Sequence, residues 1–243
     1  MKKRNKTLII MTAVLLIGAA ASPLWARNTG RPAVRGTRYP ADYNTDFASV
    51  IADLEPGVLT TGEEEGILLM REEEKLARDV YLTLAEQWNI PVFTNIARSE
   101  ETHMDAMGLL IERYGLSDPI ASATEGVTNL RGEYNNEEFN TLYRELVEQG
   151  SQSIEDAFRV GALIEDLDIA DLQRLIGESG NEDVKIVYQN LLKGSRNHLR
   201  SFSRQLSRSG ETYTPEYISL SDFNQIISGR NEAGLIDDPD FIY

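Results

Sequence analysis

Apolar residues recur at alternating intervals of three and four along residues 62–88, which is the period of an amphipathic α-helix. The positions of this stripe are Ile67, Met70, Glu74, Ala77, Tyr81, Leu84 and Trp88. Glu74 therefore places a carboxylate in the middle of an apolar face. An ionised carboxylate that faces a core is strongly unfavourable unless a cation or hydrogen-bond donors meet it. The pattern predicts a long helix whose buried side carries one carboxylate that needs a cation or hydrogen-bond donors.

Three further segments, at about 92–114, 153–176 and 182–209, show the same apolar period and again carry polar residues inside the stripe. Their polar members are Glu100 and His103, then Glu165 and Asp168, and finally Ser195 and His198. The chain has 2 histidines, and both lie in these stripes. The sequence thus predicts four long helices that share one unusual feature.

The connections between these helices indicate the architecture. Short turns join the first predicted helix to the second and the third to the fourth, whereas a long connection with a short helix at about 136–149 joins the second to the third. Two helical hairpins with one long crossover are typical of the ferritin-like four-helix bundle. We therefore predict an all-α fold, with a ferritin-like four-helix bundle over residues 59–210 and an extra short helix in its crossover.

The first 26 residues have the pattern of a secretory signal peptide. A basic start, with Lys2, Lys3, Arg4 and Lys6, precedes an uncharged apolar run from Leu8 to Ala21. Cleavage after Ala21 or Ala26 would leave an exported protein, periplasmic or extracellular, without a membrane span. The alternative is an uncleaved leader that tethers the protein to the envelope.

The segments on either side of the bundle carry weaker patterns. Residues 27–58 are predicted as a mostly extended linker with one helical turn near 49–54, because proline and glycine punctuate them. Thr61 and Glu64 have the spacing of a capping box at the start of the first long helix. Residues 211–243 are predicted as a C-terminal extension with a short helix at 221–227.

Composition narrows the range of partners and of metal ligands. The formal net charge is −15, which argues against nucleic acid or an anionic lipid surface as a partner. The chain has 0 cysteines, so it can form neither disulfides nor thiolate metal sites. Any bound metal must be held by carboxylates, imidazoles or carbonyl groups.

The polar residues in the stripes form one candidate site. Within a helix, a spacing of three places Glu100 with His103, and Glu165 with Asp168, on one face. Counted from the turns, all six groups lie at similar depth in the bundle. Carboxylates and imidazoles from four helices can bind a pair of divalent cations. The predicted ligands are Glu74, Glu100, His103, Glu165, Asp168 and His198.

Structural alternatives exist for each residue. Glu74 can pair with Arg71 or Arg78, Asp168 can pair locally, and His198 can hydrogen-bond Ser195. Together the six can also form a buried polar network in which imidazolium is the cation. Tyr81 and Tyr188 lie on the stripes, either as hydrogen-bond donors to the site or as core residues. Residues 63–65 and 72–73 are acidic runs that we interpret as a solvated helix face and as N-terminal charges favoured by the helix dipole.

Two motifs resemble those of known metal-binding bundles. Residues 74–81 (EKLARDVY) resemble the first-helix motif of rubrerythrin-like proteins, and residues 100–103 (EETH) resemble their Glu-x-x-His motif. Over about residues 59–220 the chain resembles a ferritin-like family known as domain of unknown function 2202. The segments that carry this resemblance are 70–81 (MREEEKLARDVY), 99–106 (SEETHMDA), 160–172 (VGALIEDLDIADL) and 194–202 (GSRNHLRSF).

The resemblance implies a di-metal site, with iron first and manganese second as the cofactor. It implies that Glu100 and Glu165 bridge the metals, that Glu74 is a terminal ligand, and that each metal takes one imidazole. The expected function is a redox enzyme acting on ferrous ion, peroxide or dioxygen, as a monomer or homodimer. The alternative is a non-catalytic metal-binding or protein-interaction bundle in the cell envelope.

The chain departs from the ferritin pattern at one point. Three residues before His198 the pattern has a second glutamate, and Ser195 stands there instead. Asp168, one turn after Glu165, is the expected substitute, although its shorter side chain reaches less far. The second metal position therefore depends on where Asp168 lies.

Overall fold

The computed structural model describes residues 43–121 and 130–241. The predicted signal peptide, residues 1–26, and the first part of the predicted linker lie outside the described residues. Within the described part the chain forms seven helices and no strands, which confirms the all-α prediction. The helices are α1 (Tyr43–Ala52), α2 (Thr61–Trp88), α3 (Pro91–Tyr114), α4 (Glu137–Gly150), α5 (Ile154–Glu178), α6 (Glu182–Arg208) and α7 (Leu220–Ser228).

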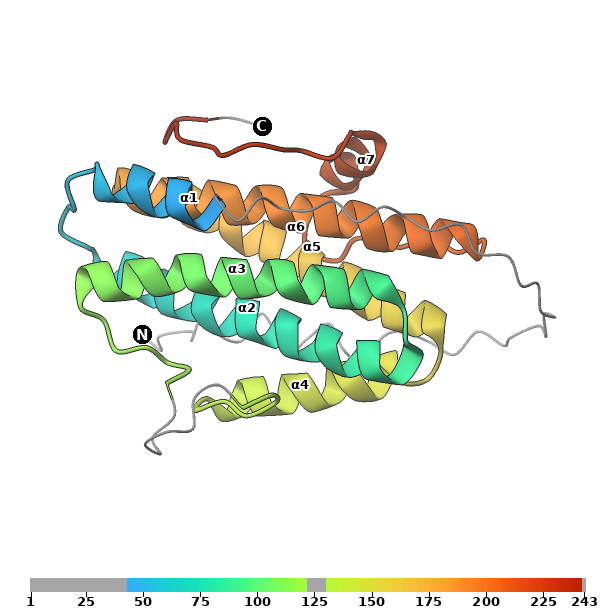
Figure 1. Cartoon of the computed structure of the whole chain (residues 1–243). Helices are drawn as coiled ribbons and strands as arrows, with labels where there is room; N and C mark the ends of the chain where they lie inside the picture. The colour runs from blue at the N-terminus through green and yellow to red at the C-terminus, as the bar shows by residue number, and fades with distance from the viewer. Residues whose placement is uncertain (1–42, 122–129, 242–243) are drawn as a thin grey trace, which may run out of the picture.

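Four long helices enclose the core in a closed ring (Figure 1). The helices α2 and α3 pack as one hairpin, and α5 and α6 pack as the other. The hairpins join through contacts of α2 with α5 and of α3 with α6. Each of the four helices therefore has two neighbours, and each can direct a side chain to the common axis.

The helix of the long crossover, α4, covers an outer face of this ring. It packs against both α2 and α5 (Figure 1). The crossover is fastened to α2 by Asp79, which is 0% exposed and accepts hydrogen bonds from Lys75, Arg78, the Gly132 amide and the Tyr134 hydroxyl. This cover buries acidic residues that the sequence analysis assigned to solvent.

That assignment was wrong for Glu72 and Glu73. Their exposed fractions are 8% and 2%, because the face of α2 that carries them lies inside the protein. The apolar stripe of α2 shows which face packs in the bundle core. It does not show that other helices also cover the neighbouring faces, which carry polar residues.

The start of α2 differs from its prediction by one residue. The capping box is formed by Thr60 and Glu63, not by Thr61 and Glu64. Glu63 also accepts hydrogen bonds from the Ser179 hydroxyl and from the amides of Gly180 and Asn181. One carboxylate therefore caps α2 and ties its first turn to the turn between α5 and α6.

The predicted linker contains more helix than expected. The structure has α1 at Tyr43–Ala52, where a single turn was predicted near 49–54. Ile51 is 3% exposed, and α1 contacts α3. The apolar residues near position 50 are thus explained by packing against the bundle.

The C-terminal extension runs back along the bundle (Figure 1). Asp166 of α5 accepts hydrogen bonds from the Tyr213 hydroxyl and from the amides of residues 216–218, which fixes the segment before α7. After α7 the chain follows α6, where Asn190 and Asn197 each pair with the backbone of a tail residue, Ile236 and Glu232 respectively. None of the helices among the described residues has the length and apolarity needed to cross a membrane.

A candidate metal centre inside the bundle

The six predicted site residues are all buried. Their exposed fractions lie between 0% for Glu165 and 8% for His103. They come from all four helices of the ring: Glu74 from α2, Glu100 and His103 from α3, Glu165 and Asp168 from α5, and His198 from α6. The structure brings five of them together in two groups, each able to hold a metal ion.

The first group consists of Glu74, Glu100 and His103. One ligand atom from each lies within 4.8 Å of the others. His103 Nδ1 is 3.1 Å from Glu74 Oε2 and 2.8 Å from Glu100 Oε2. The spacing of three between Glu100 and His103 on α3 thus places both side chains on one side, opposite Glu74 of α2.

The second group consists of Glu100, Glu165 and His198. Its ligand atoms also lie within 4.8 Å of one another. His198 Nδ1 is 2.8 Å from Glu100 Oε1 and 3.4 Å from Glu165 Oε2. Glu100 therefore belongs to both groups, one oxygen facing His103 and the other facing His198. The two imidazole rings are stacked with their centroids 5.5 Å apart.

Several polar atoms at this centre have no hydrogen-bond partner. They are Glu74 Oε1, Glu100 Oε1, Glu165 Oε2 and His198 Nδ1. The His198 and Glu100 atoms are close enough for a hydrogen bond, yet their orientation does not form one. Buried polar atoms without partners are costly, whereas lone pairs that converge on one point are what a metal ion requires. The residues present therefore fit a pair of divalent ions.

The buried carboxylates and imidazoles of the site shift one another's pKa values. Burial disfavours the imidazolium of His103, but Glu74 and Glu100 outweigh burial and raise its pKa to about 9. Burial likewise opposes charge on Glu100, while His198 and His103 outweigh it and lower its pKa to about 2. For Glu165 burial prevails and raises its pKa to about 7. The imidazoles and Glu100 therefore stabilise each other's charged forms.

Two residues around the centre hold its ligands in place. The Tyr81 hydroxyl donates to Glu165 Oε1 at 2.6 Å, so Tyr81 is a donor to the site as well as a core residue. Gly194 of α6 leaves room for His103, because a Cβ atom there would lie 2.4 Å from the ring atoms Cε1 and Nε2. Tyr188 is 0% exposed, and its hydroxyl has no hydrogen-bond partner among the described residues.

Asp168 does not join either group. It is 3% exposed and lines a separate cavity with Glu73, one turn along α5 from Glu165. Ser195 is also buried, and its hydroxyl donates to the Leu191 carbonyl of its own helix. The role of Asp168 as the substitute for the missing glutamate therefore stays a prediction, and neither three-residue group includes this side chain.

The alternatives raised for Glu74 can be compared with its observed contacts. Arg71 pairs with Asp118, and Arg78 pairs with Asp79 and Glu101. Glu74 faces His103. The site is thus a carboxylate and imidazole cluster, as the stripes indicated.

Sequence reasoning missed Gly194 and Glu73. Gly194 carries no side chain to interrupt a pattern, and only its proximity to His103 across two helices reveals its role. Glu73 stands next to Glu74 in an acidic run that resembles a solvated surface. Its position relative to α4 and α5 was the missing information.

The chain matches a known protein family over most of its length. The profile of a family described as an uncharacterized protein domain, DUF2202, matches residues 63–230. The chain belongs to the DUF2202 family. The match begins at the first turn of α2 and ends just after α7, so it contains the whole helical ring and all six candidate residues.

A relative with a solved structure shares this domain. The chain is 50% identical over 185 residues to the uncharacterized protein MJ0754 of Methanocaldococcus jannaschii, covering 76% of this chain and 97% of the relative. The crystal structure of hypothetical protein MJ0754 from Methanococcus jannaschii DSM 2661 superposes with a TM-score of 0.70, covering 74% of this chain and 99% of that one. The DUF2202 fold is therefore shared with an experimentally determined structure.

Proposed function

We propose that this DUF2202 protein is a ferritin-like carboxylate protein that binds two divalent metal ions and uses them for redox chemistry. The observation that supports it most is the position of Glu100, which belongs to two groups of possible ligands at once. Each group adds one further glutamate and one histidine. A shared carboxylate between two such groups is the arrangement by which a bundle core holds a metal pair.

The donor set favours iron, with manganese as the alternative. Carboxylate oxygens with one imidazole per ion suit these metals, and the absence of thiolates disfavours soft ions. Glu74 and His103 would hold one ion, Glu165 and His198 the other, and Glu100 both. A bound iron pair would supply the electrons for the reduction of peroxide or dioxygen, or accept them from ferrous ion.

The protein's own residues would prepare this site. Tyr81 fixes the orientation of Glu165 through its hydrogen bond, and Gly194 sets the position of His103. Burial of all five ligands excludes bulk water, which strengthens their interaction with a cation. With three protein ligands for each ion, further coordination positions remain for water or a small oxidant.

Metal counting tests the proposal. The purified protein would be loaded with ferrous iron without oxygen, freed of excess metal, and analysed by mass spectrometry of the metal. We expect at least two ions per chain, and two fewer in Glu100→Ala than in the parent protein. Glu101→Ala is the matched control, since Glu101 is the next residue on α3 but its side chain is 54% exposed. Fewer than one ion in the parent protein would overturn the proposal.

A second function is favoured by Ser195 and Asp168. Because neither contributes to the groups, the second ion has one carboxylate fewer than a ferritin-like site, and the protein could bind metal without turnover. Ferrous oxidation in air and peroxide consumption by the iron-loaded protein separate the two. Turnover that is lost in Glu100→Ala supports the enzyme, and a fully loaded but inactive protein supports a metal-binding module.

Export remains part of the proposal on sequence grounds. The basic start and the apolar run of residues 8–21 predict a cleaved signal. The N-terminal sequence of protein isolated from its native cells would test it. A start at residue 22 or 27 supports export, and an intact Met1 supports a retained leader.

A further inference from the structure

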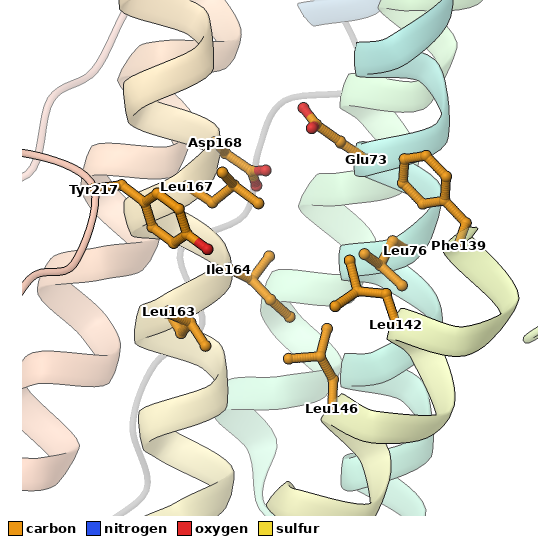
Figure 2. Close-up of a pocket in the computed structure, with 10 residues that line it drawn as sticks. All are labelled: Glu73, Leu76, Phe139, Leu142, Leu146, Leu163, Ile164, Leu167, Asp168 and Tyr217. Atoms are coloured by element: carbon orange, nitrogen blue, oxygen red, sulfur yellow. The ribbon is translucent and has the colours of Figure 1, made fainter. Parts of the chain in front are cut away.

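A small cavity lies beside the metal centre, between α2, α4 and α5. Its wall is mostly apolar, with leucine, isoleucine and phenylalanine side chains from all three helices, and Tyr217 of the C-terminal segment closes one side (Figure 2). The volume open to the centre of a water-sized sphere is about 20 Å³. A space of this size holds one water molecule or one ion.

Two carboxyl groups enter this apolar cavity. Glu73 of α2 and Asp168 of α5 lie at the same end and point toward one another across the gap (Figure 2). Their exposed fractions are 2% and 3%. Both Glu73 oxygens lack a hydrogen-bond partner, although each is buried.

Such a pair is unfavourable without a ligand. A buried carboxyl oxygen without a hydrogen-bond partner is unfavourable whether or not the group is charged. Glu73 thus places two unpaired oxygens in a wall that is otherwise mostly apolar.

We propose that Glu73 and Asp168 form an outer binding site for a third divalent cation, distinct from the pair held around Glu100. A cation between them would accept lone pairs from both carboxylates and complete its shell with water in the cavity. This assignment also gives a role to Asp168, which neither inner group includes.

The outer site lies next to the inner pair along both α2 and α5. Glu73 precedes Glu74 on α2, and Asp168 follows Glu165 by one turn of α5, so each outer ligand adjoins an inner one. On the outer side, Asp171 lies one further turn along α5, with a side chain 20% exposed. Asp171 is paired there with Arg174 at 2.6 Å. The outer site would bind a cation before that cation reaches the inner pair, a role that rests on the proposed function.

Crystals soaked in Mn²⁺ test the site directly. Anomalous scattering at the manganese edge should show three peaks per chain, two around Glu100 and one between Glu73 and Asp168. Peaks only around Glu100, with a water molecule or nothing in the cavity, would overturn the outer site and leave the proposed function standing. No peak at either place would overturn both.

Variants test the same assignment in solution. Glu73→Gln and Asp168→Asn keep the size of each side chain and should reduce bound Mn²⁺ at equilibrium from three to two per chain. Glu72→Gln is the matched control, because it removes a neighbouring carboxylate of α2 that does not line the cavity. We expect it to retain three. Unchanged stoichiometry in both outer-site variants would contradict the proposal, and the soaked parent crystal decides the case if a variant fails to fold.

Discussion

The contact of Gly194 with His103 shows how a residue without a side chain can determine the position of a candidate ligand. Alanine at position 194 would place its Cβ 2.4 Å from two atoms of the imidazole, a distance that requires the ring to move. We predict that Gly194→Ala weakens metal binding at the His103 position by about 10- to 100-fold, the range found when groups that orient a ligand are changed. Calorimetric titration with Mn²⁺ measures this directly.

Gly177 provides the control for that substitution. It also lies in a helix, α5, but nothing is within 4 Å of its Cβ position. Gly177→Ala should leave metal binding unchanged and stabilise the fold by about 0.5–1 kcal/mol through helix propensity. Equal metal affinity in both variants would show that Gly194 does not position His103.

At the residue scale, the sequence indicated the members of the buried cluster better than their surroundings. Glu74, Glu100, His103, Glu165 and His198 could be found because each interrupts an apolar stripe at helical spacing. Asp168 interrupts a stripe in the same way but faces a different cavity. Periodicity reports which side of a helix is buried, and it does not report which of two buried neighbours that side meets.

The junction of α2 with the turn between α5 and α6 depends on the charge of Glu63. Although burial opposes that charge, hydrogen bonds from Thr60, Ser179 and Asn181 outweigh it and lower the pKa of Glu63 from 4.5 to about 2. Since the folded pKa is depressed, this stabilisation is present above pH 4.5 and is lost as the pH falls toward 2. The difference corresponds to about 3 kcal/mol.

Glu63→Gln tests this linkage. We predict that it lowers the free energy of unfolding by about 3 kcal/mol at neutral pH, and that the gap to the parent closes as the pH approaches 2. Urea unfolding across this pH range is the measurement. Glu64→Gln, at the exposed neighbouring position, should behave like the parent at every pH. A gap that does not depend on pH would show that shape, not charge, is responsible.

Asp166 performs a similar task for the C-terminal segment. Its carboxylate accepts from one hydroxyl and three backbone amides, so Asp166→Ala would leave buried donors without a partner. Each such loss costs roughly 1–3 kcal/mol. We predict faster hydrogen exchange at residues 213–218, with the centres of α2 and α3 unchanged. Uniform acceleration through the bundle would instead show that the segment and the core unfold together.

At the scale of the elements, local sequence signals predicted the four long helices but not the positions of α4 and the C-terminal tail that cover them. Proline, glycine and capping residues placed the four long helices within about two residues of their observed ends. The positions of α4 and the C-terminal tail depend on Asp79, Asp166 and the paired asparagines of α6, whose partners are distant in sequence. Such partners have no sequence period, so their contacts had to be observed.

For the whole molecule, metal binding at the candidate centre would make stability depend on the metal concentration. Its ligands come from α2, α3, α5 and α6, so unfolding any of these helices destroys the site, and the unfolded chain retains little affinity. An ion at 100 times its dissociation constant then stabilises the native state by about 2.7 kcal/mol per site. We predict a rise in Tm on addition of Mn²⁺ that a chelator reverses.

The size of the Mn²⁺-dependent rise in Tm in different variants shows how much each ion contributes. Glu100→Ala removes the carboxylate common to both inner groups and should abolish most of the rise, whereas Glu74→Gln should abolish the part due to one ion. If Glu100→Ala and Glu101→Ala showed the same Mn²⁺-dependent Tm as the parent, the cation would be binding elsewhere on this acidic chain. The fold would then be stabilised by surface charge neutralisation, and the buried histidines would act only as counter-ions to the carboxylates of the core.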